Sequence, residues 1–120
     1  MERFTEQLCQ GSIVWGAAPD PKGNTKIRPL VVITATNEIL LDGPVVAVAI
    51  TTTCPKSVPH THVELPWAPH RHPTTMLAKR SAAVCDWLVE LRPSQVVEIK
   101  GYVPTKTMFE IVKRTSEHNT

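Results

Sequence analysis

The 120-residue sequence predicts a mainly β fold, a small and strongly bent sheet of short antiparallel strands that closes into a barrel, followed by a C-terminal helix. Eleven prolines, roughly twice the usual share of about 5%, exclude long helices because proline interrupts helical hydrogen bonding. Short runs rich in Val, Ile and Ala alternate with turn residues, which is typical of strands. Only the last stretch, over 108–115, has an apolar face with helical spacing.

The strands are expected at short intervals along the chain. Their ranges are 12–17, 30–34, 45–52, 61–65, 81–91 and 96–103. The segment 19–27 is rich in turn residues and is expected to be a loop, and the Asp-Gly pair at 42 and 43 is a strong turn signal. A short helical lead-in is expected over 4–8. The closing helix is expected near Thr107, whose spacing to Glu110 fits a capping box.

The composition predicts one ordinary globular domain over residues 1–120. Apolar residues make up 42% and charged residues 20%, which excludes a largely disordered chain. The longest apolar run, 45–50, is far shorter than the roughly 20 residues of a membrane helix. Residues 1–11 contain no signal-peptide core. We therefore expect a cytoplasmic protein without membrane association.

The net charge of +2 does not by itself predict a nucleic-acid-binding protein. The positive side chains are nevertheless grouped in two polar stretches: Lys22, Lys26 and Arg28, and then Arg71, Lys79 and Arg80. Such clusters of positive charge either bind a phosphate backbone or increase the solubility of the protein surface. The three widely spaced cysteines exclude a disulfide framework and a zinc site built from paired cysteines.

Several segments, in their order and spacing, resemble the MazF/PemK toxin family. They are 11–15 (Gly-Ser-Ile-Val-Trp) with Asp20, Pro21 and Gly23; Arg28 and Pro29 before the apolar run 30–33; 46–51 ending in Thr51; 61–64 (Thr-His-Val-Glu); Val84, Cys85 and Asp86; and the closing helix. The resemblance covers nearly the whole chain. It implies an SH3-like barrel that acts as a homodimer, cleaves single-stranded mRNA at selected sequences without a metal or other cofactor, and is held off by a cognate antitoxin.

RNA cleavage without a metal uses the substrate's own 2′-OH as the nucleophile. A base removes its proton, the oxygen attacks the adjacent phosphorus, and the 5′-oxygen leaves. The products are a 2′,3′-cyclic phosphate and a 5′-hydroxyl. This reaction needs a cation and hydrogen-bond donors around the doubly negative phosphorane, together with acid–base groups.

The resemblance assigns the catalytic roles to Arg28 and Thr51. The planar guanidinium of Arg28 matches phosphate oxygens, and the hydroxyl of Thr51 donates to phosphate or holds the 2′-OH. Thr52 is the alternative, because a slip of one residue sends a strand side chain to the other face. Asp86 is the candidate base, since partial burial in its apolar strand would suit it to proton transfer, but an ion-pair role is equally consistent. His62 is the other candidate base.

The residues expected to bind RNA are Lys22, Lys26, Thr52, His62, Trp67, Lys79 and Arg80. Trp67 either stacks on an unpaired base or anchors its loop. The pairs His60/His62 and His70/His72 have the i, i+2 spacing of zinc ligands on a strand, but prolines interrupt that segment, and no metal site is expected.

The sequence departs from the family pattern at two places. Val84 stands where some members have an arginine, and the stretch 22–27 contains no acid. Any mechanism that needs a second arginine and a loop acid is therefore in question. The alternative function is a catalytically weak or inactive barrel that binds RNA or a protein partner, and a zinc-binding loop protein is a third interpretation.

Overall fold

The computed structural model describes residues 8–20, 22–40 and 42–119, so the expected lead-in over 4–8 lies, except for Leu8, outside the described residues. The elements are β1 (Ser12–Pro19), β2 (Thr25–Val32), η1 (Thr36–Glu38), β3 (Val45–Thr51), β4 (His62–Leu65), β5 (Ser81–Leu91), η2 (Pro93–Gln95), β6 (Val96–Tyr102) and α2 (Thr105–His118). All six expected strands are present. β5 has the expected bounds, whereas β2 begins five residues before the expected strand.

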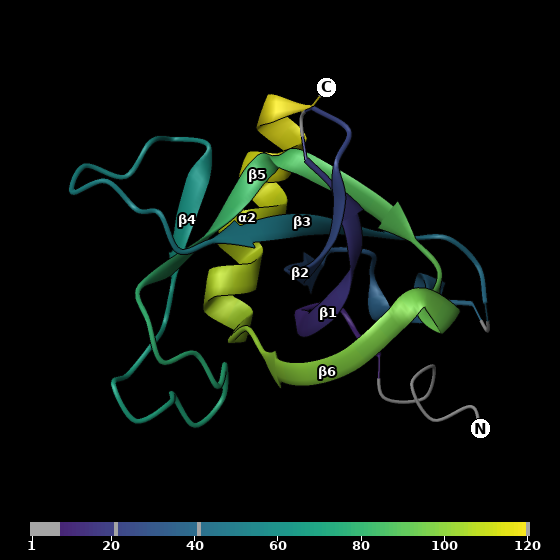
Figure 1. Cartoon of the computed structure of the whole chain (residues 1–120), viewed down its shortest axis with the longest axis horizontal. Helices are drawn as coiled ribbons and strands as arrows, with labels where there is room; N and C mark the ends of the chain where they lie inside the picture. The colour runs from purple at the N-terminus through teal and green to yellow at the C-terminus, as the bar shows by residue number, and fades with distance from the viewer. Residues whose placement is uncertain (1–7, 21, 41, 120) are drawn as a thin grey trace.

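The six strands form one antiparallel sheet in the order β4-β5-β3-β2-β1-β6. The sheet bends strongly, with β6 curving across one end of the molecule and β3 and β5 crossing its middle (Figure 1). The mainly β fold with a C-terminal helix is confirmed, but β4 and β6 remain two free edges, so the sheet is not a closed barrel. β4 has only four residues, and the loop after it bonds to β6 instead, through Tyr102 N–H donating to the Thr74 carbonyl at 2.9 Å.

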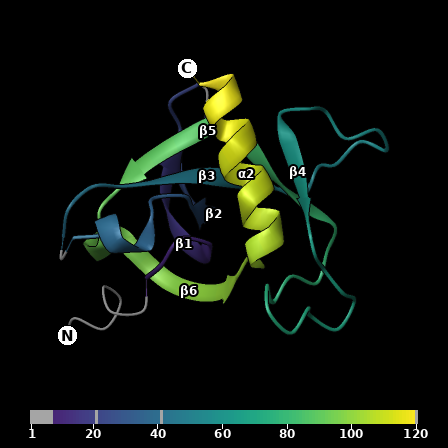
Figure 2. The ribbon, with the colours of Figure 1, turned by 180° about the vertical axis from the view of Figure 1, so that it is seen from behind.

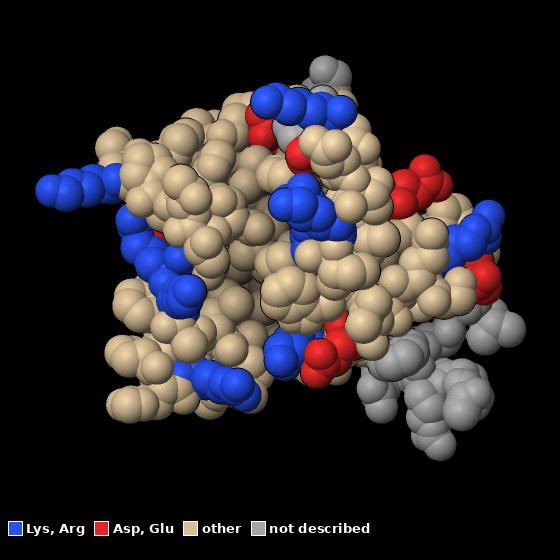
Figure 3. All heavy atoms as spheres, in the orientation of Figure 1, with Lys and Arg blue, Asp and Glu red and all other residues tan. Residues whose placement is uncertain are grey.

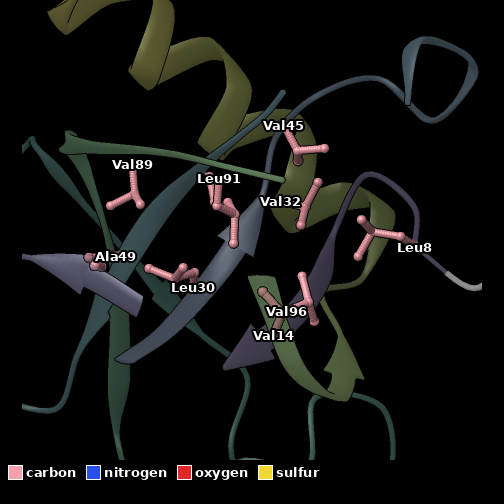
Figure 4. Close-up of a cluster of buried hydrophobic side chains, with 11 residues drawn as sticks. Leu8, Val14, Leu30, Val32, Val45, Ala49, Val89, Leu91 and Val96 are labelled. Atoms are coloured by element: carbon pink, nitrogen blue, oxygen red, sulfur yellow. The ribbon is translucent and has the colours of Figure 1, made fainter. Parts of the chain in front are cut away.

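Hydrophobic side chains pack on both faces of the sheet. The first cluster lies inside the bend and contains Leu8, Val14, Ala18, Leu30, Val32, Val45, Ala47, Ala49, Val89, Leu91 and Val96 (Figure 4). The second lies under α2, which crosses the opposite face (Figure 2), and contains Ile13, Val31, Val48, Ile50, Val63, Leu65, Ala83, Cys85, Val103, Met108 and Ile111. In β1, β2 and β3, alternate residues therefore enter different clusters.

Helix α2 begins two residues before the expected capping box. Pro104 occupies the N-cap position without a side-chain cap, so the expected cap at Thr107 is wrong. Proline at this boundary has a backbone angle compatible with helix entry and no N–H to satisfy. Glu110 instead pairs with Arg114 one turn later, at 2.7 Å between Oε2 and Nε, and this contact lowers the pKa of the Glu110 carboxyl. No described helix is long and apolar enough to span a membrane.

The buried thiol of Cys85 belongs to the second cluster. Its side chain is completely inaccessible, and this burial raises the pKa of the thiol above its usual value. Cys9 and Cys54 are partly exposed, and all three cysteines are free. A buried thiol with a raised pKa is a poor nucleophile, so Cys85 is a packing residue.

Candidate active site

Arg28 and Thr51 lie on the same face of the sheet, Thr51 at the end of β3 and Arg28 at the point of β2 where its pairing with β3 stops. The β2–β3 register pairs Leu30 with Ala49, and the same register continued by two residues brings Arg28 opposite Thr51. Arg28 is two residues from Leu30, and Thr51 is two residues from Ala49, so their side chains point to the same face as those of Leu30 and Ala49, which is the face of the first hydrophobic cluster. The side chain of Thr52, one residue further along, points to the opposite face. The register therefore places Thr51, and not Thr52, on the face of Arg28.

Pro29 explains why the two strands part at this point. It is the fifth residue of β2 rather than its first, and its register partner on β1 is Trp15. The pairing of β2 with β3 begins only at the next residue, Leu30. Proline lacks the N–H that a strand between two neighbours requires, so it is tolerated where only one neighbour is paired. The pair Arg28 and Thr51 consequently stands where the β2–β3 ladder has ended.

Three contacts fix the guanidinium of Arg28. Its Nε donates to the Ala18 carbonyl at 3.2 Å, and its Nη2 lies 3.8 Å from Oδ2 of Asp20. Its Cζ lies 5.3 Å from the centre of the Trp87 ring, within cation–π range. The Trp87 indole N–H in turn donates to the Pro19 carbonyl at 3.2 Å. Among the residues that the structure describes, none bonds to Nη1, so part of the planar donor group is available to bind a ligand.

Asp20 organises the turn between β1 and β2 as well as contacting Arg28. Its Oδ1 accepts the backbone N–H groups of Lys22 at 2.8 Å and Asn24 at 2.9 Å, and its Oδ2 accepts the Asn24 side-chain amide at 3.3 Å. The Asn24 backbone N–H contributes most to lowering the pKa of the Asp20 carboxyl, with a smaller contribution from Arg28. Asp20 is thus the acid of the first loop, two residues before the stretch 22–27 that contains none.

We expect the charge of Asp20 to stabilise the fold in a pH-dependent way. Because its pKa is lower in the folded chain than the ordinary 3.8, this contribution is complete above that value and is lost as the pH falls through the folded pKa. Asp20→Asn preserves the oxygen that accepts the two backbone N–H groups but removes the charge beside Arg28. In thermal melts, the difference between wild type and Asp20→Asn should be constant from about pH 8 to about pH 5 and disappear well below pH 4. A difference of equal size at pH 3 and pH 7 would contradict this role.

Asp86 lies in an irregular part of β5. The β3–β5 register pairs Val48 with Leu88 but Ala49 with Val84, so the residues between Val84 and Leu88 form a bulge. The expectation that Asp86 is partly buried is wrong, because the bulge turns its side chain to solvent. Asp86, Asp20 and Trp87 all line an open hollow of about 470 Å³. Asp86 therefore shares this hollow with Asp20 and Trp87, the two side chains that contact the guanidinium of Arg28.

Thr51 and His62 are on the same face as Arg28, and both have local partners. The Thr51 Oγ1 accepts the backbone N–H of Thr53 at 3.1 Å, which leaves its own hydroxyl hydrogen to donate. The register of β4 with β5 pairs His62 with Val84, and His62 Nδ1 lies 2.9 Å from Thr61 Oγ1. Both residues therefore stand on the face where the proposed chemistry needs them.

The other RNA-binding residues expected from the sequence are spread over three regions. Lys22 and Lys26 are exposed at the β1–β2 turn, and Trp67 is 39% exposed in the loop after β4. Lys79 and Thr52 line a second hollow on the opposite face of the sheet. Arg80 already has partners within the chain, because its Nε lies 3.0 Å from Oε2 of Glu64 and its Nη1 donates to the Cys54 carbonyl. The hydrogen bond to Glu64 raises the pKa of Arg80.

The histidine pairs do not lie on strands in the way that a shared zinc site requires. His60 precedes β4 and its Nδ1 lies 2.9 Å from Nε2 of His118 on α2, whereas His62 turns to Thr61. His72 accepts the N–H of Thr74 at Nδ1 within a loop. The part of the chain that the structure describes contains no group of three or more residues able to hold a metal ion.

Comparison with known proteins relates this geometry to one family. The model of the family described as PemK-like, MazF-like toxin of type II toxin–antitoxin system matches residues 9–117. No curated protein sequence matches the chain significantly.

Solved structures share the fold at low sequence identity. MazF (Form-I) from Deinococcus radiodurans is 18% identical with a TM-score of 0.67, over 92% of this chain and 94% of that one. An endoribonuclease from Mycobacterial species is 18% identical with a TM-score of 0.63, over 92% and 89%. An endoribonuclease in complex with its cognate antitoxin, also from Mycobacterial species, is 17% identical with a TM-score of 0.65, over 92% and 93%.

Proposed function

This chain belongs to the PemK-like, MazF-like toxin family of type II toxin–antitoxin systems, and on that premise we propose that it is the toxin of such a pair. Its activity is the cleavage of single-stranded mRNA in the cytoplasm, by one MazF/PemK-like domain over residues 1–120. The observation that carries the proposal is the oriented guanidinium of Arg28 on the same face as the Thr51 hydroxyl, at the end of the β2–β3 ladder.

In the proposed reaction Arg28 binds the scissile phosphate through the unpaired edge of its guanidinium. Asp20 and Trp87 hold that group from the other side, so its position is set before substrate arrives. The Thr51 hydroxyl donates to a phosphate oxygen or orients the 2′-OH. As the 2′-oxygen attacks, negative charge grows on the phosphorane, and the fixed donors stabilise the transition state more than the bound substrate.

The proton of the 2′-OH needs an acceptor, and the side chains of Asp86 and His62 suit that role. Asp86 is exposed at the hollow beside Arg28, and its carboxylate accepts a proton without prior rearrangement. His62 is on the same face but its Nδ1 is within hydrogen-bond distance of Thr61. We propose Asp86 as the base, because it shares the hollow with the two residues that hold Arg28.

The function is tested by incubating the purified protein with a long RNA of mixed sequence in excess EDTA. We expect cleavage at a small set of sites, leaving 2′,3′-cyclic phosphate and 5′-hydroxyl ends, since the proposed chemistry uses no metal. Binding without cleavage would favour the alternative of an inactive RNA-binding protein. Activity that is lost with EDTA and restored by zinc would contradict the mechanism and favour the histidine pairs as ligands.

We also propose that the toxin is a homodimer and that a cognate antitoxin binds it. One similar structure is a complex of an endoribonuclease with its cognate antitoxin. Phe109 and Val112 are 73% and 39% exposed on α2, and such apolar side chains gain from contact with a second chain. Sedimentation at micromolar concentration should give twice the chain mass of 13.3 kDa, whereas a monomer would contradict the dimer.

A further inference from the structure

A second hollow, of about 290 Å³, lies on the face of the sheet opposite Arg28. Its floor is formed by Trp15, Pro29 and Ile50 from three neighbouring strands, and its wall by Met76 and Ala78 from the loop over 66–80. This volume is at the small end of the roughly 300–1,000 Å³ of small-molecule sites, and an aromatic floor with a mostly apolar wall is the usual lining of such sites. It holds one flat group rather than an extended ligand.

The loop that forms the wall is fixed to the sheet by its backbone. Thr75 is completely buried, and its hydroxyl donates to the Pro66 carbonyl at 2.8 Å. Tyr102 N–H donates to the Thr74 carbonyl at 2.9 Å. A Cβ at Gly101 would lie 2.5 Å from the Thr75 carbonyl oxygen, so the loop rests directly on bare backbone. The hollow is therefore a preformed feature of the fold.

Backbone strain in this loop is confined to two residues that line the hollow. Arg71 and Met76 have φ angles of 76° and 63°, and they are the non-glycine residues with positive φ in the described chain. Such a conformation disfavours side chains with a Cβ and persists where surrounding contacts impose it, typically at binding sites. Here it directs two long side chains, one cationic and one apolar, to the same opening.

The charge around the hollow favours an anionic chain. Arg71, Lys79 and Lys100 line it, and none of its lining residues in the described chain is acidic. Lys100 is partly neutralised by Glu98, at 3.8 Å, which leaves Arg71 and Lys79 as the cations for a ligand. Basic side chains also gather on the side of the molecule where the loops around β4 lie, at the left of Figure 3. Flat aromatic surface next to such cations is the pattern of single-stranded RNA binding.

We propose that this hollow binds one unpaired base of the RNA, with its flanking phosphates on Lys79 and Arg71, and so contributes to the choice of cleavage sequence. The proposal rests on the proposed endoribonuclease function. Pro29 lines the hollow and directly follows Arg28, and Thr52 likewise follows Thr51. Because β3 ends at Thr51 and β2 is no longer paired with it there, an RNA strand passes from one face to the other around the end of β3 within about one to two nucleotides, since a sheet layer is roughly 10 Å thick.

The test fills the hollow without altering its charge. Ala78→Trp does so at an exposed position, and Ser94→Trp at an exposed position of η2, outside the hollow, is the matched control. The probe is a fluorescein-labelled 12-nucleotide RNA of mixed sequence, made uncleavable by 2′-O-methyl groups, and its Kd is measured by anisotropy. Ala78→Trp should weaken binding by about fivefold to a hundredfold, the range for losing one stacked base. Ser94→Trp should bind as the wild type does.

A second variant tests the charge. Lys79→Ala should reduce the dependence of log Kd on log salt concentration by about one unit, and Lys113→Ala on α2 should leave it unchanged. On a long natural RNA, the wild type should prefer one base at a position near the cut, and Ala78→Trp should lose that preference while still cutting.

The outcomes separate the two proposals. A wild-type protein that neither binds nor cuts RNA overturns the endoribonuclease function itself. A wild-type protein that cuts, with Ala78→Trp giving the same Kd and the same cut sites, overturns only the base-binding hollow. A labelled acidic peptide containing aromatic residues serves as a third probe. Loss of its binding in Ala78→Trp, with RNA binding unchanged, would make the hollow a protein-docking site and likewise overturn the proposal.

Discussion

Arg28→Ala should lower the single-turnover rate of RNA cleavage by about 10²–10³-fold, the usual effect of removing one preorganised donor from a developing anion. The guanidinium is held by Asp20, Trp87 and the Ala18 carbonyl, so its donors are positioned before the charge develops. Its side chain is only 21% exposed, yet it belongs to neither hydrophobic cluster, and the melting temperature should change little. Arg28→Lys retains the charge but not the planar donor group, so it should restore only part of the rate.

The matched control for this experiment is Arg92→Ala. Arg92 is also a surface arginine that donates to a backbone carbonyl, that of Asp42, but it lies after β5, away from Thr51. Its variant should cleave at the wild-type rate. Wild-type cleavage by Arg28→Ala, or a defect that a lowered melting temperature fully explains, would remove Arg28 from the catalytic site. A defect in RNA affinity alone would make Arg28 a phosphate-binding residue in a protein without catalysis.

A substrate with a single 2′-deoxy nucleotide at the cut site should resist cleavage completely while binding with nearly unchanged affinity. The reason is chemical, since the proposed nucleophile is the 2′-oxygen and its absence leaves no route to a cyclic phosphate. The same substitution one nucleotide away should leave cleavage intact, which makes it the control. Gel analysis of end-labelled oligonucleotides measures both. Cleavage of the first oligonucleotide at the normal rate would show that the attacking oxygen comes from water and that the mechanism is wrong.

The strands could be predicted because β-branched runs bounded by turn residues leave few alternatives. β5 is the clearest case, as eleven residues that include two acids, Asp86 and Glu90, form one strand with the expected bounds. The first residues of β2 could not be predicted to form a strand, because Thr25, Lys26 and Ile27 are exposed and show no alternation of apolar and polar residues. Their strand conformation comes from pairing with β1, which is a tertiary effect.

The site was only partly predictable for a related reason. Arg28 and Thr51 were indicated by the family resemblance, and the register of β2 with β3 places both on one face of the sheet. The roles of Asp20 and Trp87 were not indicated, since both depend on a contact across the chain with Arg28. A local signal for Asp20 did exist, because an Asp four residues before an Asn in a Gly-containing turn is typical of a side chain that accepts backbone N–H groups. The exposure of Asp86 depends on a register shift against β3, which no pattern within β5 reveals.

Gly101 has a consequence for how proteins with this fold diverge. The loop over 66–80 rests on its bare backbone, with no space for even a methyl group. Any larger residue at position 101 raises the loop from the sheet and changes the depth of the hollow beneath it, while every lining side chain stays the same. The dimensions of the hollow are therefore encoded on a strand that supplies only Lys100 to its lining. Two homologous chains with identical lining residues would differ in the shape of the hollow if they differed at this one position.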